Sequence, residues 1–249
     1  MTISIAVKNL SKHFGKEVLF QNLSFQIKKG EIAAFVGPNG CGKTTLLNIL
    51  SGLTEKSEGV CEIKEGGPER LSYIFQNYRD SLLPWRTNYK NIALPLEVQK
   101  VQKEQVKEKI NEIQSLFEGK IALQHYPYQL SGGQQQMVAF ARALVNTPQV
   151  LFIDEPFSAL DYTNNLILRK HLQTYYRRYK PTILIITHNI EEAVHLANKI
   201  VVFSKNPTRI VDIIENTQTY PRDMGFLKSK KYAKVRERVL SAFQKVVHI

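Results

Sequence analysis

A glycine-rich segment has the residue types and spacing of a phosphate-binding loop. It reads Gly37-Pro-Asn-Gly-Cys-Gly-Lys43-Thr44. In such a loop, successive backbone N–H groups point at phosphate oxygens, and the N-terminus of the following helix adds a favourable potential. The lysine reaches the β- and γ-phosphates, and the threonine hydroxyl offers a ligand to Mg²⁺. The segment predicts a nucleoside triphosphate site formed by Gly37, Pro38, Asn39, Gly40, Cys41, Gly42, Lys43, Thr44 and Thr45.

Two carboxylates follow an apolar run later in the chain. Asp154 and Glu155 come directly after residues 150–153, which read Val-Leu-Phe-Ile. We expect Asp154 to hold Mg²⁺ through water, because hard oxygen ligands suit this ion. We expect Glu155 to be the general base that activates the attacking water, a role that accelerates a reaction by roughly 10²–10⁴-fold. The pair therefore predicts hydrolysis of the bound nucleotide.

Two further polar residues also end apolar runs. Gln76 follows residues 71–75, and His188 follows residues 182–187. We expect Gln76 to sense the γ-phosphate through Mg²⁺ or water, and His188 to contact the γ-phosphate and steady the water. The predicted catalytic residues are Glu155, His188, Gln76 and Lys43, and the predicted metal-binding residues are Thr44, Gln76 and Asp154.

A parallel sheet would position these residues. Residues 32–36 form a fourth apolar run, which leads straight into the glycine loop. Continuous apolar strands are typical of parallel sheets that are covered on both faces. Open α/β sheets bind their ligands at the carboxyl ends of such strands. We therefore expect the candidate residues to meet at one edge of the sheet.

Other segments predict an antiparallel sheet and helices. Apolar residues at positions 3, 5 and 7, and again at 23, 25 and 27, alternate as in a small antiparallel sheet. A helix is expected from Lys43 to Ser51, closed by Gly52. Residues 97–118 predict a packed amphipathic helix. Its apolar positions are Val98, Val101, Val106, Ile110, Ile113 and Phe117.

A second short motif reads Leu130-Ser-Gly-Gly-Gln134. Ser131 lies where a helix N-cap is expected, and Gln134, three residues later, would complete a capping box. Small residues at a helix N-terminus also make an anion site. The motif therefore predicts a helix whose N-terminus can receive phosphate.

Together, the glycine loop and the second motif resemble those of the ATP-binding cassette (ABC) ATPases. The resemblance covers residues 1–215 and extends to Phe14, where the family has an aromatic residue that stacks on adenine. It also includes Gln76 as the Q-loop residue, Asp154 as the Walker B residue and His188 as the switch residue, with residues 158–161 as the D-loop. ATP and Mg²⁺ are the cofactors that it implies.

The resemblance also implies an architecture. The fold would be α/β, a P-loop NTPase (ABC ATPase) with a mainly parallel sheet core, an N-terminal antiparallel β-subdomain and a helical signature subdomain. The ATPase domain would span residues 1–215, with the helical subdomain at about 77–145. A basic tail with a helix would follow over residues 216–249.

In this family, two ATPase subunits, identical or not, face each other head to tail. Each ATP is clamped between the glycine loop of one subunit and the second motif of the other. The resemblance therefore implies that a nucleotide bound by the partner is contacted by Ser131, Gly132, Gly133 and Gln134. One departure is Met137, where the family usually has Arg, so the ion pair that this Arg would make is not expected here.

Residues 76–87 and 91–96 resemble those of the nitrate/sulfonate/taurine-type importer ATPases, which touch a cytoplasmic helix of the permease there. This implies uptake of a small oxyanion or organic anion through an integral-membrane permease. It also implies an extracytoplasmic solute-binding protein and a peripheral location on the cytoplasmic face of the membrane. Trp85 is either a core anchor or a permease contact, and its neighbours Pro84 and Arg86 favour an exposed loop and hence the contact.

The formal net charge of +12 leaves a choice of explanations. Much of the excess lies in residues 222–249, and residues 169–180 contain no acid. Such charge suits an anionic membrane surface or nucleic acid, or a solvated helix face. The alternative function is thus a nucleic-acid-associated ABC ATPase of repair or translation. A single cassette without a long heptad insertion favours the transporter, and we expect no nucleic-acid partner.

The remaining composition predicts a soluble cytoplasmic chain. No window approaches the roughly 18–20 apolar residues of a membrane helix, and the N-terminus does not have the pattern of a secretory signal. The two cysteines, Cys41 and Cys61, suggest neither a disulfide framework nor a metal site.

Overall fold

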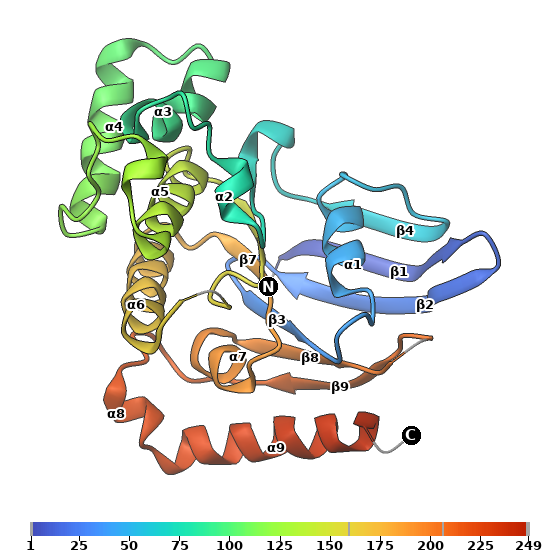
Figure 1. Cartoon of the computed structure of the whole chain (residues 1–249). Helices are drawn as coiled ribbons and strands as arrows, with labels where there is room; N and C mark the ends of the chain where they lie inside the picture. Colours follow the sequence, from blue (N-terminus) through green and yellow to red (C-terminus); the bar gives the residue numbers. More distant parts are fainter. Residues whose placement is uncertain (1, 159, 206, 248–249) are drawn as a thin grey trace. The chain divides into compact units, whose positions relative to one another are not determined.

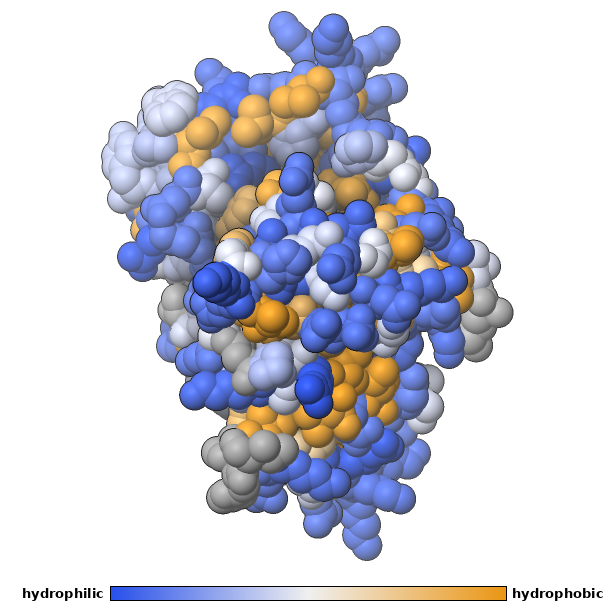
Figure 2. Space-filling model, turned by 90° about the vertical axis from the view of Figure 1, so that its right-hand side faces the viewer, coloured by the Kyte–Doolittle hydropathy of each residue, from blue (hydrophilic) through white to orange (hydrophobic). Residues whose placement is uncertain are grey.

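Two segments that are far apart in sequence form the first of two structural units. The computed structural model describes residues 2–158, 160–205 and 207–247 (Figure 1). The first unit comprises Met1–Gly66 and Pro181–Ile249, and the second comprises Gly67–Lys180. In the described residues, no helix combines the length and the apolar composition that a membrane span requires. On the face shown in Figure 2, hydrophilic residues predominate and apolar residues form smaller areas.

The first unit contains the antiparallel sheet that the alternating apolar residues predict. Its strand order is β2-β1-β4, with β1 at Ile3–Phe14, β2 at Glu17–Lys28 and β4 at Glu58–Ile63. Ile5 and Val7 of β1 are opposite Ile27 and Phe25 of β2, and all four side chains are buried. The period-2 pattern therefore identified both strands and their buried face.

The same unit carries parallel strands in the order β7-β3-β8, with β9 antiparallel at the outer side of β8. These strands are β3 (Ile32–Val36), β7 (Thr182–Ile186), β8 (Lys199–Phe203) and β9 (Ile210–Glu215). Every residue of β3, β7 and β8 is buried, as continuous apolar strands in a covered parallel sheet require.

The described residues of the first unit also form the helices α1 (Lys43–Leu50), α7 (Ile190–Leu196), α8 (Met224–Leu227) and α9 (Lys230–Val247). Helix α1 confirms the predicted helix, with Ser51 as its C-cap and Gly52 in a left-handed conformation. Helix α9 packs against α7, β8 and β9 (Figure 1). Its buried side chains include Tyr232, Val239 and Ala242.

Arg222 shows that part of the basic charge near the C-terminus is structural. Its side chain is 2% exposed. The guanidinium donates hydrogen bonds to the carbonyls of Val194 and Ala197, where α7 ends, and to that of Gln218. A cation at a helix C-terminus is stabilised by the helix dipole and by the carbonyls that have no partner within the helix. This arginine therefore belongs to the core, unlike the exposed lysines of α9.

The second unit contains one pair of parallel strands, β5 (Leu71–Ile74) and β6 (Val150–Asp154). Its longer helices are α3 (Asn88–Val98), α4 (Lys103–Leu116), α5 (Gly132–Leu144) and α6 (Tyr162–Tyr179). Shorter helical turns occur at α2 (Tyr78–Ser81), η1 (Pro68–Arg70) and η2 (Pro127–Gln129).

The single helix predicted over residues 97–118 is wrong. The stretch includes the end of α3 and all of α4, and Lys100 between them has a φ of 56°. A non-glycine residue in the left-handed region ends a helix. Val98 is 73% exposed and is not part of the core, whereas Val106, Ile110 and Ile113 are buried as expected.

Basic residues in the acid-free run 169–180 form ion pairs with glutamates of the same unit. Lys170 pairs with Glu118 at 2.7 Å, and Arg178 pairs with Glu112 of α4. Arg169 is 5% exposed and so is not available to a large polyanion. This arrangement favours an ion-paired helix face over a nucleic-acid surface for this run.

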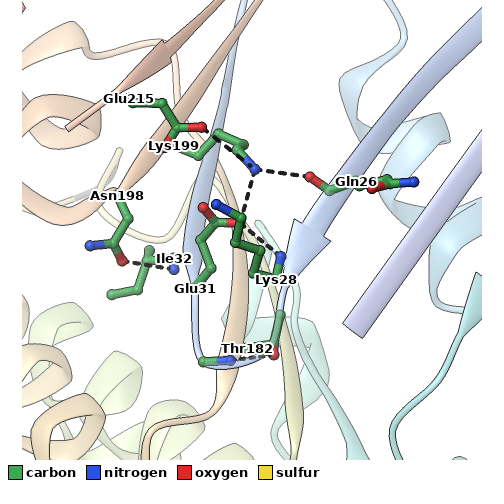
Figure 3. A network of polar contacts seen from close by, with 9 residues as sticks. Gln26, Lys28, Glu31, Ile32, Thr182, Asn198, Lys199 and Glu215 are labelled. Carbon is green, nitrogen blue, oxygen red and sulfur yellow. Dashed lines mark hydrogen bonds and ion pairs between the residues drawn. The ribbon is translucent and has the colours of Figure 1, made fainter. Parts of the chain in front are cut away.

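A buried ion pair holds the start of the strands in the first unit together (Figure 3). The Lys199 ammonium lies 3.0 Å from a Glu31 carboxylate oxygen, and both side chains are 8% exposed. The same glutamate oxygen accepts from the Lys28 N–H at 2.8 Å, and the lysine also donates to the Gln26 carbonyl at 3.0 Å. One charge pair therefore ties β2 to the beginnings of β3 and β8.

Lys199→Met should destabilise the chain by about 3–5 kcal/mol, because it leaves the Glu31 carboxylate buried without its cation. Urea unfolding monitored by circular dichroism measures the change. Adding Glu31→Gln should recover part of the loss, since the amide is uncharged and still accepts from Lys28. Arg238→Met, which removes an exposed pair with Asp212, should cost less than about 1 kcal/mol. Equal effects of Lys199→Met and Arg238→Met would contradict the importance of the buried pair.

Candidate functional site

The glycine loop begins where the buried strand β3 ends. Gly40 and Gly42 have φ values of 77° and 88°, which L-residues with a Cβ rarely adopt. Gly37 is confined by packing instead, because a Cβ there would lie 3.0 Å from the Cys41 sulfur and 3.1 Å from Phe203. The loop therefore needs glycine for two different reasons.

Lys43 is folded back onto the loop that precedes it. Its side chain is 7% exposed. The ammonium donates to the carbonyl oxygens of Gly37 and Pro38, each at 2.9 Å. The backbone carbonyls of the loop thus hold the Lys43 ammonium in place, and a bound phosphate could replace them as its partner.

Cys41 contributes no accessible side chain. It is fully buried, and burial raises the pKa of its thiol, an effect that Lys43 partly offsets. Its N–H donates to the Pro38 carbonyl at 3.3 Å. Only the backbone of Cys41 can therefore contact a ligand.

Phe14 is a large aromatic residue on the surface of the first unit. It ends β1, immediately before the left-handed Gly15, and is 56% exposed. The Lys12 ammonium lies over its ring, 4.7 Å from the centroid. An exposed ring of this kind can stack on a flat base.

His188 follows β7, which lies beside β3. Phe35 and Ile186 are register partners in this parallel pair, so the glycine loop and His188 leave the sheet at the same edge. Asn189 caps α7 by accepting from the N–H groups of Glu191 and Glu192. The Glu192 carboxylate accepts from the Thr187 hydroxyl at 2.6 Å.

The second unit repeats this arrangement with the other candidates. Ile74 and Ile153 are register partners in β5 and β6. Gln76, Asp154 and Glu155 therefore lie at the carboxyl ends of these two neighbouring strands. The Gln76 amide donates to a Glu155 carboxylate oxygen at 3.4 Å. Glu155 has a φ of 43°, a conformation that costs a non-glycine residue about 1–3 kcal/mol and is concentrated at functional sites.

Asp154 lies at the carboxyl end of β6 and is 3% exposed. The pKa of the Tyr73 hydroxyl is raised, first by burial and then by this carboxylate. Carboxylate, amide and hydroxyl oxygens, which Asp154, Gln76 and Thr44 supply, are the donors that Mg²⁺ prefers. In the part of the chain that the structure describes, no cluster of three His, Cys, Asp or Glu side chains could hold a metal by itself.

The second motif forms the predicted helix start. Ser131 caps α5: its hydroxyl accepts from the Gln134 backbone N–H at 3.4 Å, and the side-chain amide oxygen of Gln134 accepts from the Ser131 N–H at 2.9 Å. The capping box is therefore confirmed. A Cβ on Gly132 would lie 3.0 Å from the Arg79 guanidinium, whereas one on Gly133 would meet Asn164 at 3.4 Å. Glycine at position 132 thus allows the α2 segment to approach closely.

Trp85 is 72% exposed, so it is not a core anchor. It projects from a loop that is held in place by Asn91, a residue whose role the sequence did not reveal. The buried Asn91 amide donates to the carbonyls of Leu83, Arg86 and Thr87 at 3.0–3.2 Å, and its oxygen accepts from the Leu83 N–H at 2.9 Å. The tryptophan is therefore presented on a preformed loop.

The structure thus groups the candidate residues into sets within each unit. The first unit brings the glycine loop and His188 to one strand edge and exposes Phe14 at the end of β1. The second unit brings Gln76, Asp154 and Glu155 to one edge, and places the second motif at the start of α5. Ala159, in the predicted D-loop, lies outside the described residues.

Comparison with known proteins agrees with these features. The family model for the ABC transporter matches residues 20–158. The dimeric ATP-binding cassette MJ0796, solved in a post-hydrolysis state with ADP and Pi, is similar with a TM-score of 0.74 and 28% identity, over 87% of this chain and 100% of that chain. This similarity confirms the predicted fold class.

Curated relatives match over almost the whole chain. The aliphatic sulfonates import ATP-binding protein SsuB of Bacillus cereus is 39% identical over 97% of this chain and 96% of that protein. SsuB of Bacillus subtilis is 36% identical over 98% and 94%. The bicarbonate transport ATP-binding protein CmpC of Synechocystis is 38% identical over 96% of this chain and 38% of its own length. The chain therefore belongs to the ABC transporter family, as one of its ATP-binding subunits that hydrolyse ATP.

Proposed function

We propose that this chain powers an importer for a small oxyanion or organic anion of the nitrate/sulfonate/taurine type. The observation that carries the proposal is the near full-length similarity to import ATP-binding proteins for aliphatic sulfonates, at 36–39% identity. A bicarbonate transport relative supports the broader class of small anions. An integral-membrane permease would bind this subunit on the cytoplasmic face of the membrane, and an extracytoplasmic solute-binding protein would deliver the solute.

The nucleotide would be bound by residues from two subunits. In one subunit, Phe14 would stack on adenine and the residues from Gly37 to Thr45 would bind the phosphates. In the other, the γ-phosphate would meet the start of α5, with contacts from Ser131, Gly132, Gly133 and Gln134. The dimeric state of a similar cassette supports this arrangement. Because the capping box already fixes the start of α5, its N–H groups are preorganised for an anion.

Hydrolysis would depend on Glu155 as the general base. Its hydrogen bond from Gln76 orients the carboxylate, and the left-handed backbone fixes the direction in which the side chain leaves β6. Thr44, Gln76 and Asp154 would hold Mg²⁺, which neutralises charge on the phosphates when bound. His188 would contact the γ-phosphate and steady the attacking water.

The Trp85 loop would bind the permease. Trp85 is exposed, apolar and held on a rigid turn, which are properties of residues that dominate interface energetics. The loop begins a few residues after Gln76, so a change at the γ-phosphate has a short covalent route to the permease contact. The nearby basic residues are few, and Arg86 is paired with Glu97 at 2.6 Å, which does not suit a nucleic-acid backbone.

Glu155→Gln should lower the ATP turnover number by about 10²–10⁴-fold, or about 3–5 kcal/mol in the barrier, because the amide keeps the shape but cannot accept a proton. ATP binding should persist, so the variant should accumulate as an ATP-bound dimer in size-exclusion chromatography. Turnover is measured by phosphate release. Glu237→Gln, an exposed glutamate on α9, is the control and should behave as wild type. Near-normal turnover of Glu155→Gln would remove Glu155 from the role of base.

Trp85→Ala should weaken binding to the permease by roughly thirtyfold, since loss of a buried tryptophan anchor typically costs about 2 kcal/mol or more. Asn91→Ala should act in the same direction by loosening the loop that presents the ring. Co-purification of the ATPase with the permease, together with solute uptake, measures the effect. Met224→Ala, which also removes an exposed apolar side chain, should change neither.

The alternative function makes the opposite prediction for these variants. ATPase activity that is stimulated by DNA or RNA and depends steeply on salt would contradict the transporter assignment. Indifference of permease binding to both Trp85→Ala and Asn91→Ala would contradict the proposed docking loop alone.

A further inference from the structure

Thr208, on the connection between β8 and β9, reaches the phosphate-binding loop. Its side chain is 3% exposed, and its hydroxyl donates a hydrogen bond to the carbonyl oxygen of Cys41. The two residues are 167 positions apart in sequence. This is a contact between a buried hydroxyl and the backbone of the glycine loop, and no role assigned above uses it.

The backbone of Thr208 is itself firmly placed. Its N–H donates to the Leu19 carbonyl at 2.9 Å, and it forms a bridge with Phe20. Ser204 closes the turn from the other side, because its hydroxyl accepts from the Arg209 N–H at 2.9 Å. The threonine is thus anchored to β2 and to the end of β8, independently of the glycine loop.

Packing on the same side closes the space beneath the loop. The Leu19 side chain lies 2.8 Å from where a Cβ of Gly42 would be, and Phe203 lies 3.1 Å from where a Cβ of Gly37 would be. Thr208, Leu19 and Phe203 therefore form a floor under the loop. Within this floor, Thr208 makes a directional hydrogen bond, whereas Leu19 and Phe203 make apolar packing contacts.

The direction of that contact matters because the peptide unit is planar and trans. The C=O of Cys41 and the N–H of Gly42 belong to one peptide and point in opposite directions. A hydrogen bond that holds the carbonyl toward Thr208 therefore turns the Gly42 N–H away from the floor. That side of the peptide faces the phosphates, if the proposed nucleotide site is correct.

We propose that Thr208 is a positioning residue for nucleotide binding: by holding the Cys41 carbonyl it orients the Gly42 N–H toward the phosphate groups. The inference rests on the proposed binding of nucleotide by residues 37–45. Without the hydroxyl, the Cys41–Gly42 peptide can rotate, which is easy because Gly42 accepts many backbone conformations. The loop then has to be ordered again when nucleotide binds, and affinity falls.

The test compares Thr208→Val with Thr208→Ser in the full chain. Thr208→Val keeps the size of the side chain but removes the hydroxyl, and should raise the dissociation constant for Mg-ADP about five- to tenfold, the effect of losing one buried hydrogen bond. Thr208→Ser retains the hydroxyl and should bind ADP nearly as wild type. Isothermal titration calorimetry measures both. The Michaelis constant for ATP should rise more than the turnover number falls.

Thr182→Val provides a matched control in the same unit. Thr182 is also fully buried, and its hydroxyl donates to Glu65 at 3.2 Å and accepts from the Gly30 N–H at 3.0 Å, away from the glycine loop. Thermal unfolding should show a similar loss of stability for both valine variants, but only Thr208→Val should lose affinity for ADP. Equal loss of affinity in both would show a general effect of instability and overturn the inference.

Lys43→Ala separates failure of this inference from failure of the proposed site. If Lys43→Ala loses ADP binding and Thr208→Val does not, the glycine loop binds nucleotide and Thr208 does not position it. If Lys43→Ala binds ADP as tightly as wild type, the assignment of residues 37–45 as the nucleotide site is itself wrong.

Discussion

Strands that are buried on both faces limit the positions at which this chain can place polar functional side chains. Every residue of β3, β7 and β8 is buried, as is every residue of β6. A polar side chain inside such a strand would lose its hydration without gaining a partner. Reactive groups are therefore expected where such a strand ends, and the candidate residues Asp154 and His188 and the start of the glycine loop at Gly37 all lie at such points. The order of the functional residues in the sequence follows from the order of the strands.

At the amino ends of β3 and β8, buried charged side chains are stabilised by pairing with each other. There, Glu31 and Lys199 are buried as an ion pair, and each also has a backbone hydrogen-bond partner. Arg222 is satisfied by carbonyls at the end of α7 in a similar way. The basic composition of the chain is thus partly internal structure, and only the remainder is a property of its surface.

Local patterns predicted local structure well. The capping box of Ser131 and Gln134, the helix that begins at Lys43 and the two strands of the N-terminal hairpin each depend on residues within a few positions of one another. The break at Lys100 was missed because the residue type gives no sign of a left-handed conformation, and the amphipathic period continues through it.

Polar contacts that no motif marks could not be predicted from one sequence. The residues around Asn91 do not indicate that its amide donates hydrogen bonds to three carbonyls of the preceding loop. The residues around Thr208 do not indicate that its hydroxyl donates to the Cys41 carbonyl. Both are common polar residues without a motif, and their importance comes from where the fold puts them. The residues that we propose for the chemistry could be selected by type and spacing, whereas Asn91 and Thr208 could not.

The left-handed backbone at Glu155 has a consequence for how this protein can evolve. At a position with a φ of 43°, glycine would relieve the strain, and asparagine would also tolerate the conformation better than glutamate does. Such a substitution could recover part of the roughly 1–3 kcal/mol that the strained conformation costs. Here it would remove the carboxylate that lies beside Gln76. If that carboxylate is the base, selection for thermostability and selection for turnover act in opposite directions on one codon.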